Sequence, residues 1–406
     1  MIKRYLVALA AVAAVATVTA DAAERQTPRG TFGKLDHVFF IMMENETNTN
    51  IIGSASAPFI NSYAGVANQA TSYFAVGHPS APNYLEVTGG SNFGVSNDFW
   101  PNWNDGGCVD NAPGSSGCNN AVNPIASAGR DNAVVQTATS SSQCNGQVTI
   151  SGTPTPFNCA LYDYPSTFYT PKSIADQLVA KKKSWKSYQE SLPIVVPGAD
   201  GINYSDGAFS NLSPVADFAP GPIQKLYAVK HNPFAYFQNI QIGDNPNLSL
   251  GRITDFDGPD GLWADLQSGN APNFAFIVPN QCHDMHGFVA GGPPICSSAT
   301  PAESALLMSE GDAEVKKLVT GIKSSKAWQK GRNAIVVVWD ENDFSNSPNH
   351  VVMLVETNYA PNGHVSATPY DHYSLLRTLE AGFELPCLNH ACDATSAVMN
   401  DMFGGQ

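Results

Sequence analysis

Four short, uninterrupted apolar segments constrain the fold of this chain more than any other feature. They are DHVFFIMM at 36–43, FAFIV at 274–278, AIVVVW at 334–339 and VVMLV at 351–355. Continuous runs of this length, bounded by polar residues, are typical of strands buried on both faces, as in parallel sheets covered by helices. Such a sheet needs a covering layer on each side, so helices are expected between these segments.

Three amphipathic segments are candidates for those layers. One begins at Thr170, the expected N-cap, with Pro171 in its first turn. A second covers 312–323, where apolar residues recur at i, i+3, i+4 and i+7. A third runs over 371–381, with Gly382 as its stop. Strands that alternate with helices predict an α/β fold, an α/β/α sandwich.

The first 22 residues are predicted to be a signal peptide. Lys3 and Arg4 precede an apolar run from Leu6 to Val18, and Ala20-Asp21-Ala22 has the small-x-small pattern of a cleavage site. A membrane anchor is the alternative, but the run is short and ends in small residues. We therefore expect a secreted or periplasmic protein, cleaved near Ala22, in which 23–406 form a single domain. No later segment is long and apolar enough for stable membrane insertion.

Eight cysteines fall into four pairs that are close in sequence: Cys108 and Cys118, Cys144 and Cys159, Cys282 and Cys296, and Cys387 and Cys392. An even number behind a signal peptide indicates disulfides formed in an oxidising compartment, and we expect nearest neighbours to pair. Four of the eight lie in residues 97–165, which are rich in Asn, Gly, Ser and Pro. A loop this long is normally functional, disordered or pinned, so we expect a disulfide-pinned insertion rather than a separate domain.

The chain is acidic, with 35 Asp and Glu against 21 Lys and Arg and a net charge of −14. Loss of the predicted signal peptide leaves −15. This sign disfavours nucleic acid as a partner, because phosphate neutralisation needs clustered Lys and Arg. An anionic substrate would need a locally positive site, supplied by a metal ion, helix-terminal amides or protonated histidines.

Polar side chains follow three of the apolar segments at the point where each ends. Glu44 and Asn45 follow the first, Asp340 and Glu341 the third, and PNQCHDMHG at 279–287 the second. Open α/β sheets bind ligands at the carboxyl ends of their strands, and gathered carboxylates are costly unless a cation bridges them. We therefore expect a site for a hard cation built from these four residues. The alternative is that the acids only cap strand ends and start turns.

The motif HPSAPNY at 78–84 contains a candidate nucleophile. Pro82 suits the first turn of a helix, which would place Ser80 near an N-terminus whose free amides attract anions. A serine there, beside a metal, can be deprotonated and attack phosphorus or a carbonyl. A plain helix-capping serine is the alternative. The chain has no G-x-S-x-G elbow and no H-E-x-x-H helix, which disfavours α/β-hydrolase and zinc-protease chemistry.

Six motifs follow one another along nearly the whole mature chain: DHVFFIMMEN at 36–45, HPSAPNY at 78–84, KHNPF at 230–234, PNFAFIVPNQCHDMHG at 272–287, VWDE at 338–341 and DHYSLLRTLE at 371–380. The series resembles the phosphoesterase family that holds bacterial phospholipases C and acid phosphatases. That family is similar to the alkaline phosphatase superfamily in fold and catalytic plan. The wording of the second and fourth motifs is most similar to the secreted acid phosphatase branch.

The resemblance implies roles for individual residues. Ser80 matches the nucleophile, which would form a phosphoseryl intermediate. Glu44, Asn45, Asp340 and Glu341 match metal ligands, and Ser80 would complete their shell. An oxygen-rich shell permits Ca, Mg, Mn or Fe, and a histidine within it would admit Zn.

Further polar residues match family positions that face the phosphate or hold a second ion. They are His283, Asp284, His286 and His372, while Asn97 matches an oxygen-binding amide. A histidine near the leaving oxygen can donate a proton in mildly acidic solution, where imidazolium is populated. We take His286 and His372 as candidates for this proton donor, and buried structural histidines are the alternative.

The expected function is that of a secreted, metal-dependent acid phosphatase acting on a small phosphate-ester substrate, a monoester. A phospholipase C-like phosphodiesterase is the alternative, and a catalytically silent extracellular binding protein is less favoured because the acids, Ser80 and the histidines occur together. Two departures favour the phosphatase. Glu46-Thr47-Asn48 stands where phospholipase-like members carry Arg-Ser-Phe-Asp, and the chain ends soon after its last predicted helix, without C-terminal β-domains.

Overall fold

The computed structural model describes residues 27–93, 95, 98, 172–192, 226–237, 239–240, 243–287, 296–345 and 347–405, and the backbone of 147–150, 153–156, 212–213 and 224–225. The predicted signal peptide and most of the predicted insertion lie outside these residues. Within the described parts of the chain, no helix combines the length and the apolar character needed to cross a bilayer.

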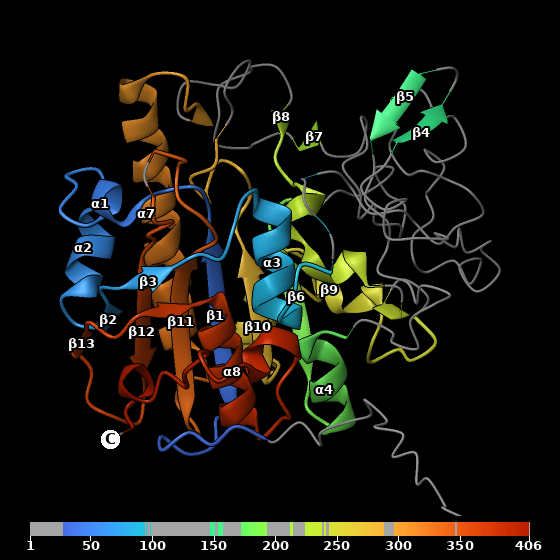
Figure 1. The fold of residues 1–406 in the computed structure, drawn as a ribbon, viewed down its shortest axis with the longest axis vertical. Helices are drawn as coiled ribbons and strands as arrows, with labels where there is room; N and C mark the ends of the chain where they lie inside the picture. Colours follow the sequence, from blue (N-terminus) through green and yellow to red (C-terminus); the bar gives the residue numbers. More distant parts are fainter. Residues whose placement is uncertain are drawn as a thin grey trace, which may run out of the picture.

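An eight-stranded sheet forms the centre of the molecule (Figure 1). Strand β1 (His37–Met43) lies in its middle and pairs in parallel with β10 (Phe274–Val278) on one side and β11 (Asn333–Trp339) on the other. From edge to edge the order is β13-β2-β12-β11-β1-β10-β6-β9. The other strands of this sheet are β2 (Asn68–Ala70), β6 (Trp185–Gln189), β9 (Ile253–Thr254), β12 (Met353–Thr357) and β13 (Val365–Ser366).

The first three predicted strands are β1, β10 and β11, and all three are parallel, as expected. The fourth, predicted at 351–355, is β12 at Met353–Thr357 and runs antiparallel to both of its neighbours. Its apolar run reflects burial on both faces, and burial does not depend on strand direction. An apolar run alone therefore identifies a buried strand but not the direction in which it runs.

Helices cover both faces of the sheet, which confirms the predicted α/β/α sandwich (Figure 1). On one face α3 (Ser80–Gly89) packs against α8 (His372–Phe383), and on the other α7 (Pro301–Ser324) packs against α2 (Pro58–Ala64) and α6 (Leu262–Ser268). Helix α4 (Ile174–Ala180) packs on β6. Other short elements are α1 (Asn48–Ile51) and the strands β3 (Tyr73–Phe74), β14 (Tyr370–Asp371), β7 (Leu212–Ser213) and β8 (Gln224–Lys225).

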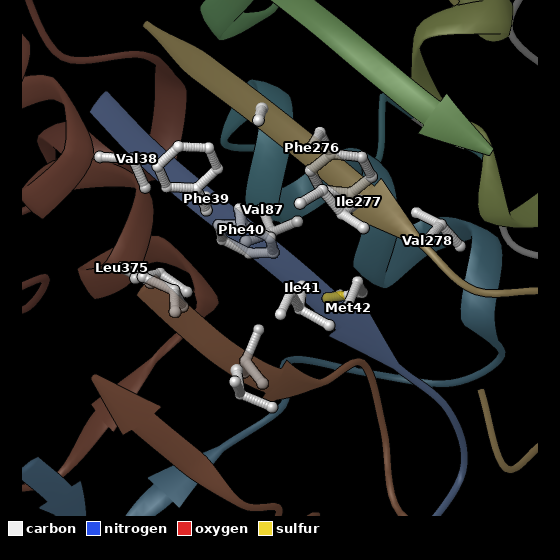
Figure 2. Packing of buried hydrophobic residues seen from close by; sticks show 14 of the residues in the cluster. Val38, Phe39, Phe40, Ile41, Met42, Val87, Phe276, Ile277, Val278 and Leu375 are labelled. Atoms are coloured by element: carbon white, nitrogen blue, oxygen red, sulfur yellow. The ribbon is translucent and has the colours of Figure 1, made fainter. Parts of the chain in front are cut away.

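The core lies between the central strands and the helices. Every residue of β1 from Val38 to Met43 is fully buried, and so is nearly all of β10. Val87 of α3 and Leu375 of α8 pack against these strands (Figure 2). Burying a large aliphatic or aromatic side chain contributes about 1.5–3 kcal/mol, so the strand centres anchor the residues that follow them.

Two helices begin elsewhere than predicted. Helix α4 starts at Ile174 after the N-cap Ser173, whose side chain forms a capping box with Asp176. The predicted N-cap Thr170 lies outside the described residues. Helix α7 contains the predicted segment 312–323 but begins eleven residues earlier, because Thr300 caps it by accepting a hydrogen bond from the Glu303 amide.

The predicted stop of the last helix is wrong. Helix α8 continues through Gly382 to Phe383, and Glu384, with φ 56°, is its C-cap. A Cβ atom at Gly382 would lie 2.6 Å from Cδ1 of Leu35. The glycine is therefore required by close packing inside the helix and not by a turn.

Two of the four predicted disulfides fall within the described residues, and both form: Cys282–Cys296 and Cys387–Cys392. Cys108, Cys118, Cys144 and Cys159 lie outside them. Of the predicted insertion, the structure describes an antiparallel pair of strands, β4 (Gln147–Ile150) and β5 (Thr153–Pro156).

Candidate active site

The carboxyl ends of three neighbouring strands bring four acids together. Glu44 follows β1, Asp340 and Glu341 follow β11, and Asp284 lies in the loop after β10. All four are fully buried. Backbone hydrogen bonds join the strand ends: the Glu44 amide donates to the Asp284 carbonyl over 2.8 Å, and the Asp340 amide donates to that of Met43 over 2.9 Å. The predicted convergence of the three strand ends is thus present, and the second contributes Asp284.

Ser80 is the first residue of α3 and lies fully buried among these acids. Its Oγ atom is 3.0 Å from Oε2 of Glu44 and 3.2 Å from Oε1 of Glu341. The N-cap of the helix is Pro79, and no side chain caps it. The alternative of a plain capping serine is therefore wrong, and the Ser80 hydroxyl faces two carboxylates.

His78 and Asn83 hold Glu341 in place. Nδ1 of His78 lies 2.5 Å from Oε2 of Glu341, and Nδ2 of Asn83 lies 3.4 Å from the same oxygen. The Asn83 amide also bonds the backbone N–H and carbonyl of Gly77 over 3.0 and 2.8 Å. These contacts fasten the segment that carries Ser80 to the end of β11.

Among the described residues, five buried polar atoms at this edge of the sheet make no hydrogen bond of regular geometry: Oε1 of Glu44, Oδ1 of Asn45, Nε2 of His231, Oδ2 of Asp284 and Oδ2 of Asp340. The His231 ring stands between two of the acids, with Nε2 3.1 Å from Oε1 of Glu44 and Nδ1 3.3 Å from Oδ2 of Asp284. Each unsatisfied buried group costs about 1–3 kcal/mol, so a ligand that pairs with several of them is strongly favoured. Oxygen atoms with one or two imidazoles are the donor set of a divalent metal ion.

The raised pKa values of the four carboxyl groups also reflect the free-energy cost of burying their charges. Burial raises the pKa of Glu44 to about 7, and burial together with the charge of Glu44 raises that of Glu341 to about 9. The pKa values of Asp284 and Asp340 lie well above the ordinary range for the same two reasons. Four such groups can all be ionised at neutral pH only if positive charge is placed among them.

Lys230 supplies part of that charge. Its Nζ atom lies 3.3 Å from Oδ2 of Asp98 and 2.9 Å from Nε2 of His286. Burial lowers the pKa of Lys230, but the charges of Asp98, Glu44 and Asp340 outweigh this effect and raise it. The sequence prediction missed both Lys230 and His231, although they form the start of the KHNPF motif. The sequence signal for these residues was a lysine followed by a histidine in a motif, within a chain that has few basic residues.

Burial and neighbouring charge disfavour the imidazolium form that the predicted proton-donor role of His286 or His372 requires. Burial and the charge of Lys230 lower the pKa of His286 to about 4, and burial lowers that of His372 to about 4. Nε2 of His372 lies 2.6 Å from the Asp340 carbonyl, and Nδ1 lies 2.9 Å from the Tyr73 hydroxyl. His372 thus positions the Asp340 backbone through contacts of both ring nitrogens.

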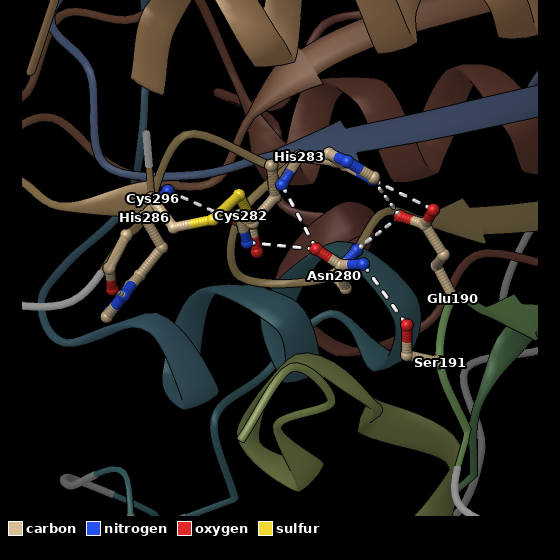
Figure 3. Close-up of a disulfide and its surroundings, with 9 residues drawn as sticks. Glu190, Ser191, Asn280, Cys282, His283, His286 and Cys296 are labelled. Atoms are coloured by element: carbon tan, nitrogen blue, oxygen red, sulfur yellow. Dashed lines mark hydrogen bonds and ion pairs between the residues drawn. A yellow bond between two sulfur atoms is a disulfide. The ribbon is translucent and has the colours of Figure 1, made fainter. Parts of the chain in front are cut away.

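His283 contacts Glu190 instead of the four acids. Nδ1 of His283 lies 2.8 Å from both carboxylate oxygens of Glu190, and Oδ1 of Asn280 accepts from the amides of Cys282 and His283 (Figure 3). The Cys282–Cys296 disulfide closes this loop. The predicted substrate amide Asn97 lies outside the described residues.

The sequence is similar to a protein family and to several phosphatases of other organisms. A sequence model described as the phosphoesterase family matches residues 55–386, which include Ser80, Asp340 and Glu341 and begin after Glu44. The chain is 23% identical to a phosphatidylinositol-3-phosphatase of Mycobacterium tuberculosis, over 88% of this chain and 80% of that protein. It is 24% identical to a probable acid phosphatase of Kluyveromyces lactis, over 88% of this chain and 60% of that protein, so it spans three fifths of the yeast relative.

Among solved structures, a protein in the alkaline phosphatase superfamily from Vibrio parahaemolyticus matches with a TM-score of 0.44 and 13% identity, over 88% of this chain and 69% of that one. The family match covers most of the chain and includes the buried serine and the two acids that follow β11. The chain belongs to the phosphoesterase family and is a hydrolase that acts on phosphoric ester bonds.

Proposed function

We propose that this protein is an exported, metal-dependent acid phosphatase that hydrolyses phosphate monoesters with Ser80 as its nucleophile. The observation that carries the proposal is the position of the Ser80 hydroxyl, buried at the start of α3 and within 3.0 and 3.2 Å of Glu44 and Glu341. The predicted leader and the acid phosphatase relatives support export and the substrate class.

A divalent cation fits the residues at this edge of the sheet. Glu44, Asn45, Asp340, Glu341 and Ser80 would hold it, and unpaired oxygens of Glu44, Asn45 and Asp340 are candidate ligand atoms. Nε2 of His231, 3.1 Å from Oε1 of Glu44, extends the set to an imidazole and so admits Zn beside Ca, Mg, Mn and Fe. When bound, such an ion neutralises phosphate oxygens and favours the ionised form of a nearby hydroxyl.

The chain's own groups perform the proton and bond chemistry. The Ser80 proton passes to the neighbouring carboxylate of Glu44 or Glu341, which lies 3.0 or 3.2 Å from Oγ and which a bound cation would keep ionised. Oγ of Ser80 bonds to phosphorus while the bond from phosphorus to the ester oxygen breaks, and the alcohol leaves with a proton from solvent. Water then cleaves the phosphoserine, which returns the Ser80 hydroxyl and releases phosphate. Lys230 contributes positive charge beside the phosphate throughout.

The decisive experiment compares Ser80→Ala with the parent protein on 4-nitrophenyl phosphate. We expect kcat to fall by about a thousandfold or more, since nucleophile removal has at least that effect in comparable enzymes. Ser309→Ala, an exposed serine on α7, is the matched control and keeps full activity. Retained turnover in Ser80→Ala, with an unchanged melting temperature, would rule out the nucleophile.

The metal and the substrate class are tested separately. Exhaustive chelation removes activity and a divalent ion restores it; activity without any metal detectable by elemental analysis contradicts the ion but not the nucleophile. Bis(4-nitrophenyl) phosphate and phosphatidylcholine are hydrolysed more slowly than the monoester. A reversed order would support the phospholipase C-like alternative instead.

A further inference from the structure

Phe344 is an exposed aromatic residue beside the nucleophile's supporting network. The residue is 62% exposed, and it is the aromatic member of the few large apolar residues that lie exposed among the described residues. Its ring stacks on the imidazole of His78, with the ring centroids 4.0 Å apart and an angle of 27° between the planes. An exposed phenylalanine is common in isolation, but this one is packed against a residue that holds the site together.

The contacts around Phe344 place it on the solvent-facing side of the residues that support Ser80. His78 bonds Glu341, and Glu341 accepts from Ser80, so two side chains separate the phenyl ring from the nucleophile. Exposure increases along this path, from the buried Ser80 and Glu341, through His78 with a side chain that is 29% exposed, to Phe344, a residue that is 62% exposed. These contacts lead from the buried reacting centre to the solvent-facing side at Phe344, and the alcohol part of an ester bound at Ser80 would also extend towards solvent.

Phe344 is held in this position by the backbone. Its φ of 60° lies in the left-handed region, which is unusual for an aromatic residue. The Phe344 amide donates to Oδ1 of Asn342 over 3.0 Å, and the Asn342 amide donates to Oδ1 of Asn349 over 2.7 Å. Asn349 in turn donates to the carbonyl of Gly77 over 2.7 Å. The loop that presents the phenyl ring is thus joined to the segment that carries His78 and Ser80.

We propose that Phe344 determines specificity by stacking against the aromatic leaving group of a phosphate monoester, an inference that rests on the proposed phosphatase function. One face of the Phe344 ring packs on His78, and most of the remaining ring surface is open to a planar apolar group. Aromatic pairs gain from offset or edge contacts in addition to apolar burial. A polar alcohol such as glycerol gains neither, so the site should favour aryl esters over small polar alkyl esters.

The test compares phenyl phosphate with glycerol 2-phosphate in Phe344→Ala, Phe344→Tyr and the parent protein. We expect Phe344→Ala to lower kcat/KM for phenyl phosphate about tenfold and to change that for glycerol 2-phosphate less than about twofold, since tenfold corresponds to about 1.4 kcal/mol. Phe344→Tyr keeps the phenyl phosphate value. Each comparison is made within one substrate, so the intrinsic reactivity of the leaving group cancels.

A binding measurement separates this inference from the proposed function. Phenylphosphonate and methylphosphonate are titrated calorimetrically, and Phe344→Ala should weaken only the phenyl compound. Val365→Ala, at a 60% exposed valine on the edge strand β13, is the matched control and changes neither. Equal losses for both compounds or both esters, or no loss for the phenyl ones, would overturn the role of Phe344. A parent protein that hydrolyses neither ester would contradict the phosphatase proposal, and the binding experiment would still decide the role of Phe344.

Discussion

The ammonium group of Lys230 lies 2.9 Å from Nε2 of His286, so this nitrogen accepts a hydrogen bond and carries no proton. Nδ1 of the same ring lies 2.8 Å from the Gly287 carbonyl, which fixes the other nitrogen as the donor. Lys230, and not an imidazolium at His286, therefore carries part of the positive charge expected at the site of this acidic protein. His286 serves as a neutral partner that orients the ammonium.

Replacing Lys230 by methionine removes this charge and is expected to impair phosphate binding. A hydrogen bond to a charged group contributes about 1.5–3 kcal/mol, so kcat/KM should fall by about ten- to a hundredfold. The pKa of His286 should rise from about 4 towards its ordinary value of 6.5, because the charge of Lys230 helps to lower it. Activity assays and an NMR titration of the His286 ring measure the two effects.

Lys186→Met is the matched control for the loss of a partly buried lysine. Lys186 pairs with Asp265 over 2.5 Å, on β6 and away from the four acids. We expect this variant to lose stability but to keep kcat/KM. An unchanged His286 titration in Lys230→Met would show that the ammonium does not act on that ring.

The stability of the metal-free protein should fall as pH rises from about 5 to 9. The pKa values of Glu44 and Glu341 rise from an ordinary 4.5 to about 7 and about 9 in the folded chain. Between these limits the folded protein binds more protons than the unfolded chain, so each increase in pH favours unfolding. Melting temperatures measured with a chelator at pH 5, 7 and 9 should decrease by several degrees.

A bound divalent ion should remove this slope, because it stabilises the ionised carboxylates. Glu341→Gln should flatten the profile in chelator, since its side chain cannot ionise. A flat profile for the chelated parent protein, or an equally steep one with metal, would contradict the assignment of these acids to a cation site.

The sheet and the acids at its edge could be predicted because each depends on residues adjacent in sequence. An apolar run of five to eight residues records burial on both faces, and the residue after it is necessarily at the strand end. This reasoning located Glu44 and Asp340 without any knowledge of their contacts. The direction of β12 was not predictable in this way, since a strand buried on both faces reads the same in either direction.

The contacts that the site residues make with distant parts of the chain could not be predicted from the spacing of residues in the sequence. Lys230 meets Asp98 and His286 from segments 132 and 56 residues away, and no local pattern encodes such contacts. The role of His372 depends on Tyr73, which is 299 residues distant. Phe344 could not be predicted as a site residue, because neither its exposure nor its contact with His78 has a sequence signature.

Gly382→Ala is expected to destabilise the protein although alanine is the better helix former. The added Cβ would lie 2.6 Å from Cδ1 of Leu35, and overpacking of this kind costs about 1–3 kcal/mol against a gain of about 1 kcal/mol in helix propensity. Gly251→Ala is the control, because its Cβ would meet nothing nearer than the Ser249 hydroxyl at 3.4 Å. Denaturant unfolding measures both, and a Gly382→Ala variant as stable as the parent would show that Leu35 can move aside.

The two disulfides should differ in their effect on activity. Cys282–Cys296 closes the loop that carries Asp284 and His286, whereas Cys387–Cys392 lies beyond the C-terminal end of α8. Removing the first bridge by Cys282→Ala and Cys296→Ala should destabilise the protein by about 3 kcal/mol, given its 14-residue separation, and lower kcat/KM at temperatures where the protein remains folded.

The control is the corresponding double alanine variant of the second bridge, whose cysteines are only five residues apart. This shorter loop restricts the unfolded chain less, so its loss should cost less stability. Activity should be retained, because the Asp284 backbone that holds Glu44 and the His286 ring that faces Lys230 keep their positions. Thermal unfolding and kcat/KM measured on the same two preparations distinguish the roles. Equal activity losses in both variants would mean that the first bridge stabilises the whole fold and does not position the site.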